Sequence, residues 1–200
     1  MCGGDAAAVV VDDASVTHVA GAVEAAVSSF GRLDALVNYA GVRQPHVSFD
    51  ELTVDVWDSM FAVHARGAFL CLKHGSRAIA ASGGGSVVLV SSMGGVEGYG
   101  SDAAVGYCAA KAAIVGFSRA LALELAPKGV AVSVVALGYF PYGLIQGVPE
   151  GQQEQLKSWI PFSRFGGAPE LGGLVVYLFS DAGAYTGGQI DHLNGGLYSG

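Results

Sequence analysis

The chain has 200 residues, of which 52% are hydrophobic and 14% charged, a composition typical of one globular domain spanning residues 1–200. The formal net charge of −7 and the lack of any arginine-rich run argue against a nucleic-acid partner. No apolar run approaches the roughly 20 residues of a membrane helix, and the first residues lack the basic and apolar regions of a signal peptide. We therefore expect a cytoplasmic protein that binds neither nucleic acid nor membrane.

The first half of the chain alternates between strand-like and helix-like segments. Short apolar runs bounded by polar residues or glycines predict strands, and apolar residues at helical spacing predict helices. The predicted strands cover residues 6–11, 34–38 and 86–90. The predicted helices cover residues 16–30 and 54–80.

The second half continues this alternation. Residues 104–125 predict a helix that stops at Pro127, and residues 130–136 predict a strand. Residues 138–161 predict a loop with a short helix at 152–159, and a helix from Pro169 and a strand at 189–193 follow. The alternation predicts an α/β fold, a Rossmann-like doubly wound parallel sheet with helices on both faces.

Four predicted strands are followed by, or end in, a polar residue or a glycine: Asp12, Asn38, Ser92 and Gly138. In open α/β sheets, ligands bind outside the carboxyl ends of the strands. These residues therefore predict a functional site at one edge of the sheet.

Tyr107 and Lys111 stand four residues apart on the helix predicted at 104–125. Residues at i and i+4 share a helix face, so the ammonium can lie beside the phenol. An adjacent cation favours the phenolate, and such a phenol can exchange protons near neutral pH. A serine at the end of a neighbouring strand could bind the same substrate oxygen. The spacing alone also fits an ordinary surface pair.

The cysteines and histidines do not predict a metal site. Cys2, Cys71 and Cys108 are an odd number without a CxxC pair, which indicates free thiols in a reducing compartment. The five histidines show no HxH or HExxH spacing.

Six short segments occur in a characteristic order. Residues 30–41 read FGRLDALVNYAG and residues 85–92 read GSVVLVSS; YCAAK at 107–111, VAVSVVALG at 130–138, YTGGQ at 185–189 and NGG at 194–196 follow. In this order and spacing they resemble the motifs of the short-chain dehydrogenase/reductase family. The resemblance runs from Phe30 to Gly196 and implies an NAD(P)-dependent oxidoreductase.

The resemblance implies a role for each residue of a catalytic set. Tyr107 would be the acid and base, Lys111 would lower its pKa and bind the nicotinamide ribose, and Ser92 would orient the substrate oxygen, with Ser91 as the alternative. His64 stands where the family has a catalytic asparagine. It could hold a water that relays protons from Lys111, or it could be a partly buried structural residue.

The resemblance also implies a site for NAD or NADP. The residues implied to bind it are Asp12, Asp13, Asn38, Ala40, Gly41, Tyr107, Lys111, Gly138 and Tyr139. Asp12 and Asp13 could also cap the helix at 16–30, and both roles can coexist. Tyr39, Leu137 and Tyr142 replace the asparagine, proline and threonine usual in the family.

The family's glycine-rich phosphate-binding segment, TGxxxGxG, has no counterpart in the 200 residues. The resemblance begins just before the family's third strand, which predicts an N-terminally truncated sheet with the first two strands missing. We expect the strands at 6–11 and 34–38 either to pair directly or to leave an open edge. We also expect this chain to bind nicotinamide cofactors weakly. A fragment or misassigned start, degeneration, or a second chain would each account for the gap.

The predicted function is the interconversion of an alcohol and a ketone by hydride transfer, with proton transfer through Ser92, Tyr107 and Lys111. The alternative is a catalytically silent family member that serves as a subunit or scaffold. The aromatic residues within 138–161 predict a small apolar alcohol or carbonyl substrate. By resemblance, the helices at 54–80 and 104–125 form a homodimer or homotetramer interface.

Overall fold

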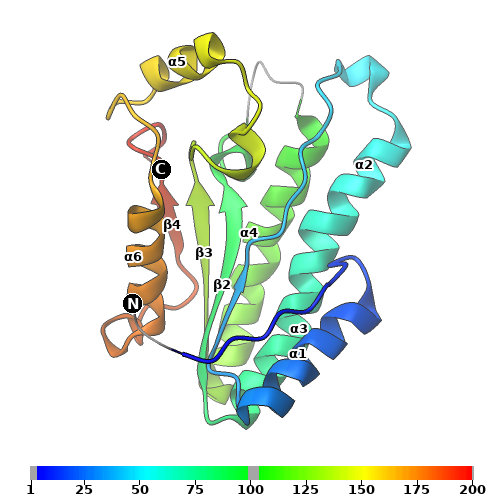
Figure 1. Cartoon of the computed structure of the whole chain (residues 1–200), viewed down its shortest axis with the longest axis vertical. Coiled ribbons are helices and arrows are strands. Elements are labelled where there is room, and N and C mark those ends of the chain that lie inside the picture. Colours follow the sequence, from blue (N-terminus) through cyan, green and yellow to red (C-terminus); the bar gives the residue numbers. More distant parts are fainter. Residues whose placement is uncertain (1–3, 99–103, 200) are drawn as a thin grey trace.

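A sheet of four parallel strands forms the centre of the molecule. The computed structural model describes residues 4–98 and 104–199, apart from the side chain of Leu144. The strands lie in the order β1-β2-β3-β4, and each neighbouring pair is parallel. They are β1 (Ala35–Asn38), β2 (Gly85–Ser92), β3 (Val130–Leu137) and β4 (Ile190–Leu193). Their carboxyl ends point the same way, toward α5 (Figure 1).

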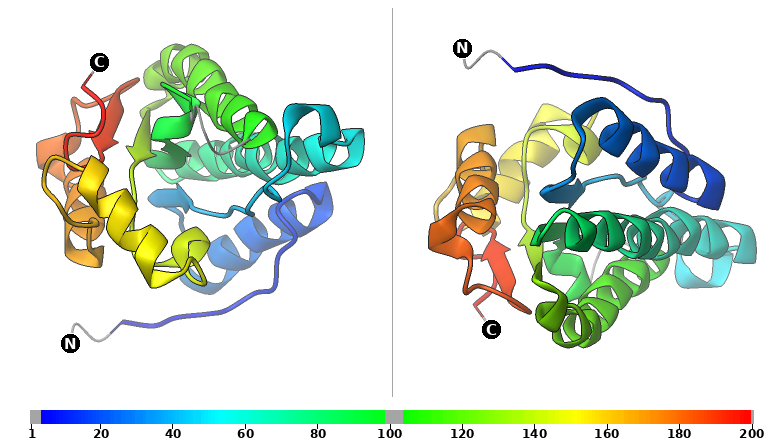
Figure 2. Two further views of the ribbon diagram at one scale, coloured as in Figure 1. Left: turned by 90° about the horizontal axis from the view of Figure 1, so that it is seen from above. Right: turned by 90° about the horizontal axis from the view of Figure 1, so that it is seen from below.

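Helices cover both faces of this sheet (Figures 1 and 2). They are α1 (Val16–Phe30), α2 (Val54–Met60), α3 (Gly67–Ala81), α4 (Val105–Leu125), α5 (Glu150–Trp159) and α6 (Ala168–Phe179). On one face, α3 and α4 pack on the sheet, and α1 packs against α3. On the other face, Leu178 of α6 packs among strand residues. The predicted α/β fold, a doubly wound parallel sheet, is confirmed.

Successive side chains of the central strands point to opposite faces of the sheet and form two separate hydrophobic cores. Val87, Leu89 and Val134 face α3 and α4, whereas Val88 and Val135 face α6. A strand with both faces covered must be apolar at nearly every position, which explains the uninterrupted apolar runs of β2 and β3. The two buried strands pair over eight residues, from Gly85 opposite Val130 to Ser92 opposite Leu137.

The predicted strand at residues 6–11 is wrong. These residues adopt no regular structure and lie along the outside of the molecule (Figure 2), with Val10 99% exposed. A strand is stable only when its backbone groups pair with a neighbour. In the described part of the chain, β1 pairs with β2 alone, so the open edge that we considered is present and residues 6–11 do not fill it.

The predicted helix at 54–80 is helical throughout, but its middle turn is not α-helical. Between α2 and α3, residues Phe61–Arg66 form a π-helical turn. Such turns insert an extra residue into the helical repeat and are frequent at functional sites. His64 lies inside this turn.

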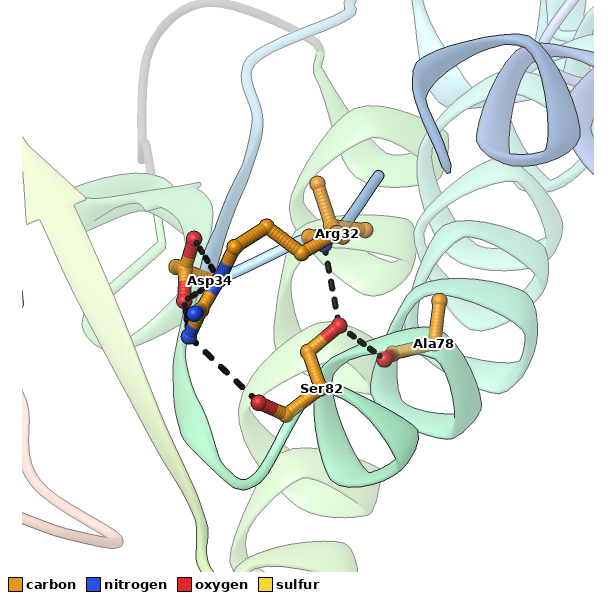
Figure 3. Close-up of polar contacts among 5 residues, drawn as sticks. Arg32, Asp34, Ala78 and Ser82 are labelled. Atoms are coloured by element: carbon orange, nitrogen blue, oxygen red, sulfur yellow. Dashed lines mark hydrogen bonds and ion pairs between the residues drawn. The ribbon is translucent and has the colours of Figure 1, made fainter. Parts of the chain in front are cut away.

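A polar joint fixes the start of β1 against the end of α3 (Figure 3). The Ser82 hydroxyl donates to the carbonyl of Ala78 at 2.9 Å and accepts from the Leu33 N–H at 3.0 Å. On the solvent side, the Arg32 guanidinium donates to the Asp34 carboxylate at 2.6 Å. The serine therefore ties the two elements together, and the exposed arginine adds a longer bond to the Ser82 carbonyl at 3.4 Å.

We expect Ser82→Ala to lower the free energy of unfolding by about 1 kcal/mol, because it removes the acceptor of a partly buried backbone N–H. Asp34→Ala is the matched comparison, and its loss should be smaller because its ion pair is exposed. Urea denaturation of both variants measures the difference. Equal losses would mean that the ion pair, and not the serine, holds the joint.

Candidate active site

A pocket of about 760 Å³ opens at the carboxyl ends of β2 and β3, below α5. β2 contributes Ser91 and Ser92, and α4 contributes Tyr107 and Lys111. Of the other predicted site residues, His64, Gly41, Gly138 and Tyr139 also line it. The structure therefore brings the predicted catalytic residues together from elements that are distant in sequence.

Lys111 is buried at the floor of this pocket, with 4% of its surface exposed. Its Nζ donates to the carbonyl of Val90 at 2.8 Å and lies 5.8 Å from the centre of the Tyr107 ring. Burial disfavours the charged form and lowers the pKa of Lys111 to about 8. The side chain is thus a cation near neutral pH that can lose its charge under mildly basic conditions.

The two serines at the end of β2 have different partners. The Ser91 hydroxyl donates to the Lys111 carbonyl at 2.9 Å, a contact that joins β2 to α4. The Ser92 oxygen accepts from the Gly94 N–H at 3.1 Å, which fixes its side chain at the pocket wall. Because Ser91 is engaged with the helix backbone, the geometry favours Ser92 as the substrate-facing serine.

His64 is buried, with 1% of its surface exposed, and its ring lies edge-on to Tyr107 with centroids 5.1 Å apart. Its Nε2 lies 2.9 Å from the Val42 carbonyl, to which it donates when it carries the ring proton, and 3.4 Å from the Val42 N–H, from which it accepts when it does not. The Nδ1 atom is buried and has no hydrogen-bond partner within the described residues. Burial, reinforced by the charge of Lys111, lowers the pKa of His64 to about 4. The imidazole is therefore neutral near pH 7.

This low pKa predicts how acid acts on the fold. As the pH falls from 6.5 to about 4, the unfolded chain takes up a proton at this histidine and the folded chain does not. Because of His64, we expect the free energy of unfolding to fall by about 3 kcal/mol as the pH falls across this interval. His64→Asn should flatten that part of a stability-against-pH curve measured by urea denaturation. His18→Asn, at an exposed position, is the control, and an equal effect of both would contradict the prediction.

Of the residues predicted for the adenosine end of the cofactor, Gly41 lines the pocket, whereas Asp12, Asp13, Asn38 and Ala40 do not. Asp13 bonds the Asn38 side chain, and Asn38 donates to Cys71 Sγ at 3.5 Å. Burial raises the pKa of the Asp13 carboxyl. Asp12 accepts from the Ala14 N–H in the turn before α1, and Ala40 lies beyond β1. These residues fasten the N-terminal segment to the edge of the sheet.

The interpretation of Asp12 or Asp13 as the cap of α1 is wrong. Ser15 is the N-cap residue, and its hydroxyl oxygen accepts from the His18 N–H at 3.4 Å. A cap must stand directly before the first helical residue, which places the two aspartates too far upstream.

The outer wall of the pocket is apolar and comes from the segment between β3 and α6. Its side chains are Tyr139, Phe140, Tyr142, Ile145, Val148, Leu156 and Trp159. Tyr142 and Trp159 are about half exposed, so they stand at the mouth of the pocket. The sequence had indicated this aromatic segment, and the short helix predicted at 152–159 is confirmed as α5.

Three polar residues of the pocket were missed by sequence reasoning: Arg43, Gln44 and His46. They follow Gly41 in a loop with no recognisable periodicity. The one available signal is indirect, because Ala104, directly before α4, has no side-chain acceptor for the helix amides. Gln44 supplies that acceptor from another part of the chain.

Residues 4–98 and 104–199 contain no cluster of three or more potential metal ligands. The helices in these ranges are too short or too polar to be membrane spans. Cys71 and Cys108 form no disulfide, and Cys2 lies outside the described residues.

Most of the chain is similar in sequence to known proteins. A family model described as enoyl-(acyl carrier protein) reductase matches residues 2–198. The 3-oxoacyl-[acyl-carrier-protein] reductase FabG of Escherichia coli K12 is 33% identical over 189 residues, which are 94% of this chain and 75% of the relative. Nodulation protein G of Azospirillum brasilense is 34% identical over 170 residues, 85% of this chain and 68% of the relative.

A solved structure also aligns with the chain. It is a crystal structure from Sinorhizobium meliloti 1021, described as a short-chain alcohol dehydrogenase, with a TM-score of 0.87 and 33% identity. The alignment covers 94% of this chain and 75% of that one.

Proposed function

The chain belongs to the short-chain dehydrogenase/reductase family of NAD(P)-dependent oxidoreductases, and we propose that it interconverts an alcohol and a ketone through Ser92, Tyr107 and Lys111. The observation that carries the proposal is the convergence of these three side chains on one pocket from β2 and α4. None of them is near the others in the sequence except Tyr107 and Lys111, so the constellation arises from the fold.

The pocket fits the nicotinamide end of a cofactor. Lys111, a buried cation, and the Gly138 and Tyr139 turn border the same space as Tyr107. We propose that these four residues hold the nicotinamide end of NAD or NADP, with Asp12, Asp13, Asn38, Ala40 and Gly41 acting at the adenosine end. The bound cofactor would supply or accept a hydride at the carbonyl carbon.

The chain's own residues would handle the proton. In the reducing direction, the Tyr107 hydroxyl would donate a proton to the carbonyl oxygen, while Ser92 orients that oxygen by a hydrogen bond. The Lys111 ammonium stabilises the phenolate that results. Because His64 is neutral near pH 7, it adds no second positive charge beside Tyr107.

His64 has two candidate roles, a proton relay through a bound water and a structural role. Its Nδ1 is buried without a hydrogen-bond partner in the described residues, and its ring contacts Tyr107. If it serves the relay, a water must gain access to this atom. His64→Asn should then retain activity and His64→Leu should lose it at a similar melting temperature. If both variants lose stability in parallel with activity, the histidine is structural only.

The substrate should carry an apolar group next to its carbonyl. The aromatic and aliphatic outer wall offers no charged partner, and the pocket volume of about 760 Å³ is large enough for a chain of several carbons. Two names among the relatives refer to acyl carrier protein substrates, and a 3-oxoacyl chain would present such a carbonyl. We therefore place apolar alcohols and carbonyls, including 3-oxoacyl thioesters, as the substrate class.

Exposed apolar side chains support a proposed homodimer or homotetramer. Val54 of α2, Phe69 of α3 and Leu123 of α4 are 72%, 43% and 80% exposed, on the helices expected to form the interface. The alternative is a catalytically silent subunit in a reducing cytoplasmic compartment. Such a subunit would keep these exposed apolar surfaces but would not turn over a substrate.

Cofactor titration and turnover distinguish these proposals. Quenching of Trp57 and Trp159 fluorescence by NADH or NADPH measures binding, and loss of nicotinamide absorbance measures reduction of 3-oxoacyl thioesters and of simple ketones with matching chain length. We expect weak binding, because the 200 residues contain no counterpart of the glycine-rich phosphate-binding segment. We also expect faster turnover of the substrates with longer apolar chains. Binding without turnover of any carbonyl would favour the silent subunit.

A further inference from the structure

The first turn of α4 holds the proposed catalytic tyrosine and donates a hydrogen bond to a distant part of the chain. Tyr107 is the third residue of this helix, and its backbone N–H has no intrahelical acceptor. The N-cap residue, Ala104, forms no side-chain cap bond. The Tyr107 N–H instead donates to Gln44 Oε1 at 2.9 Å, from a residue 63 positions earlier in the chain.

Close packing holds Gln44 in this position. Its surface is only 6% exposed, and a Cβ atom at Gly106 would lie 3.0 Å from its Oε1 and 3.4 Å from Met60. The absence of a side chain at Gly106 therefore lets the glutamine reach the helix end. Burial of an amide is costly unless it is hydrogen-bonded, so the contact with the Tyr107 N–H stabilises this arrangement.

A second contact fixes the loop that carries Gln44. Two residues before it, the Val42 carbonyl lies within hydrogen-bond distance of His64 Nε2, at 2.9 Å. A Cβ atom at Gly41 would lie 2.9 Å from the same ring, so only glycine permits this approach. The loop is thus bound at Val42 to the π-helical turn and at Gln44 to α4, the two elements whose rings meet at His64 and Tyr107.

We infer that Gln44 is a positioning residue for the reaction: it acts as a long-range N-cap of α4 and sets the place of the Tyr107 phenol. Lys111, one turn further, is held separately by the Val90 carbonyl. Loss of the cap should therefore displace the phenol relative to an ammonium that stays in place. The kinetic part of this inference rests on the proposed function, but the structural part does not.

The test uses Gln44→Met, which keeps the side-chain length and removes the acceptor, and Gln44→Glu, which retains it. Residue-resolved amide exchange by NMR should show Tyr107 exchanging roughly tenfold faster in Gln44→Met and near the wild-type rate in Gln44→Glu. The amide of Ala112, deeper in α4, is the internal reference. Gln153→Met, which removes a glutamine outside the pocket lining, is the matched control and should leave Tyr107 exchange unchanged.

Turnover gives the second readout. We expect kcat to fall roughly tenfold in Gln44→Met with little change in KM, and Gln44→Glu to restore it. If Gln44→Met does not fold, Gln44→Asn, one methylene shorter, gives the same two measurements. Unchanged Tyr107 exchange in a folded variant without the acceptor would overturn the inference. If the Tyr107 amide exchanges faster in the variant but neither the wild type nor the variant shows turnover, the capping role of Gln44 is supported and the proposed function is contradicted.

Discussion

Tyr107→Phe should reduce kcat/KM for a carbonyl substrate by roughly 10²- to 10⁴-fold, the range typical of a lost general acid. The substitution removes only the hydroxyl, and the ring keeps its edge-on contact with His64. Stability should therefore change little, and cofactor affinity should fall far less than kcat/KM, because only the contact of the hydroxyl is lost. Initial rates with NADPH or NADH, beside thermal melts and fluorescence titrations, measure the three quantities.

Tyr185→Phe is the control for this experiment because Tyr185 is fully exposed and outside the pocket. It should match the wild type in all three measurements. Near-normal turnover in Tyr107→Phe would refute the assignment of Tyr107 as the proton donor. A loss of activity that is accompanied by a lower melting temperature would instead indicate a packing role for the hydroxyl.

Lys111→Met should abolish turnover and remove a pH dependence of stability. The pKa of Lys111 is about 8 in the folded chain against an ordinary value of 10.5. Below pH 8 both states carry the charge, and the folded state bears the full cost of burying it. As the pH rises to 10.5 the folded state loses its proton first, so the free energy of unfolding should rise by about 3 kcal/mol relative to the variant.

Urea denaturation of wild type and Lys111→Met at pH 7 and pH 10 measures this difference. The variant leaves the Val90 carbonyl without its donor, which lowers its stability at both pH values but does not change the slope. Lys128→Met, at an exposed ion pair, is the control. Parallel curves for wild type and Lys111→Met would show that the buried ammonium is not destabilising. Any residual turnover of the variant should have a higher pH optimum, because the phenol has lost its cationic neighbour.

Much of the fold was predictable because its strands and helices are specified locally. The apolar runs of β2 and β3 and the helical spacing of α1 and α4 need no knowledge of partners. Residues 6–11 show where this reasoning fails, since an apolar run becomes a strand only if a neighbour supplies hydrogen bonds. The π-helical turn at Phe61–Arg66 also has no periodic signature, since it is one irregular turn within an otherwise regular helix.

The same distinction between local patterns and long-range contacts applies to the residues of the site. Tyr107, Lys111 and Ser92 were identified from the family resemblance together with their places on one helix and at the end of one strand, and the structure brings them to one pocket. Gln44 was not, because its role depends on a contact with an amide 63 residues away and on the absence of a side chain at Gly106. Local patterns can identify the residues that carry the chemistry, whereas the residues that hold them in place are defined by the packing between elements.

Helix α5 contributes less to the stability of the fold than the other elements that line the pocket. None of its residues is buried, although Leu156 and Trp159 face the substrate space, and its neighbour Ile160 anchors its end. Substitutions along α5 therefore remove few core contacts and should leave the folded state nearly as stable. A gene encoding this chain can accumulate changes there without crossing the stability threshold, and such changes would alter which molecules enter while the chemistry beneath stays the same. Libraries aimed at new substrates would lose the fewest members to misfolding if they were confined to α5.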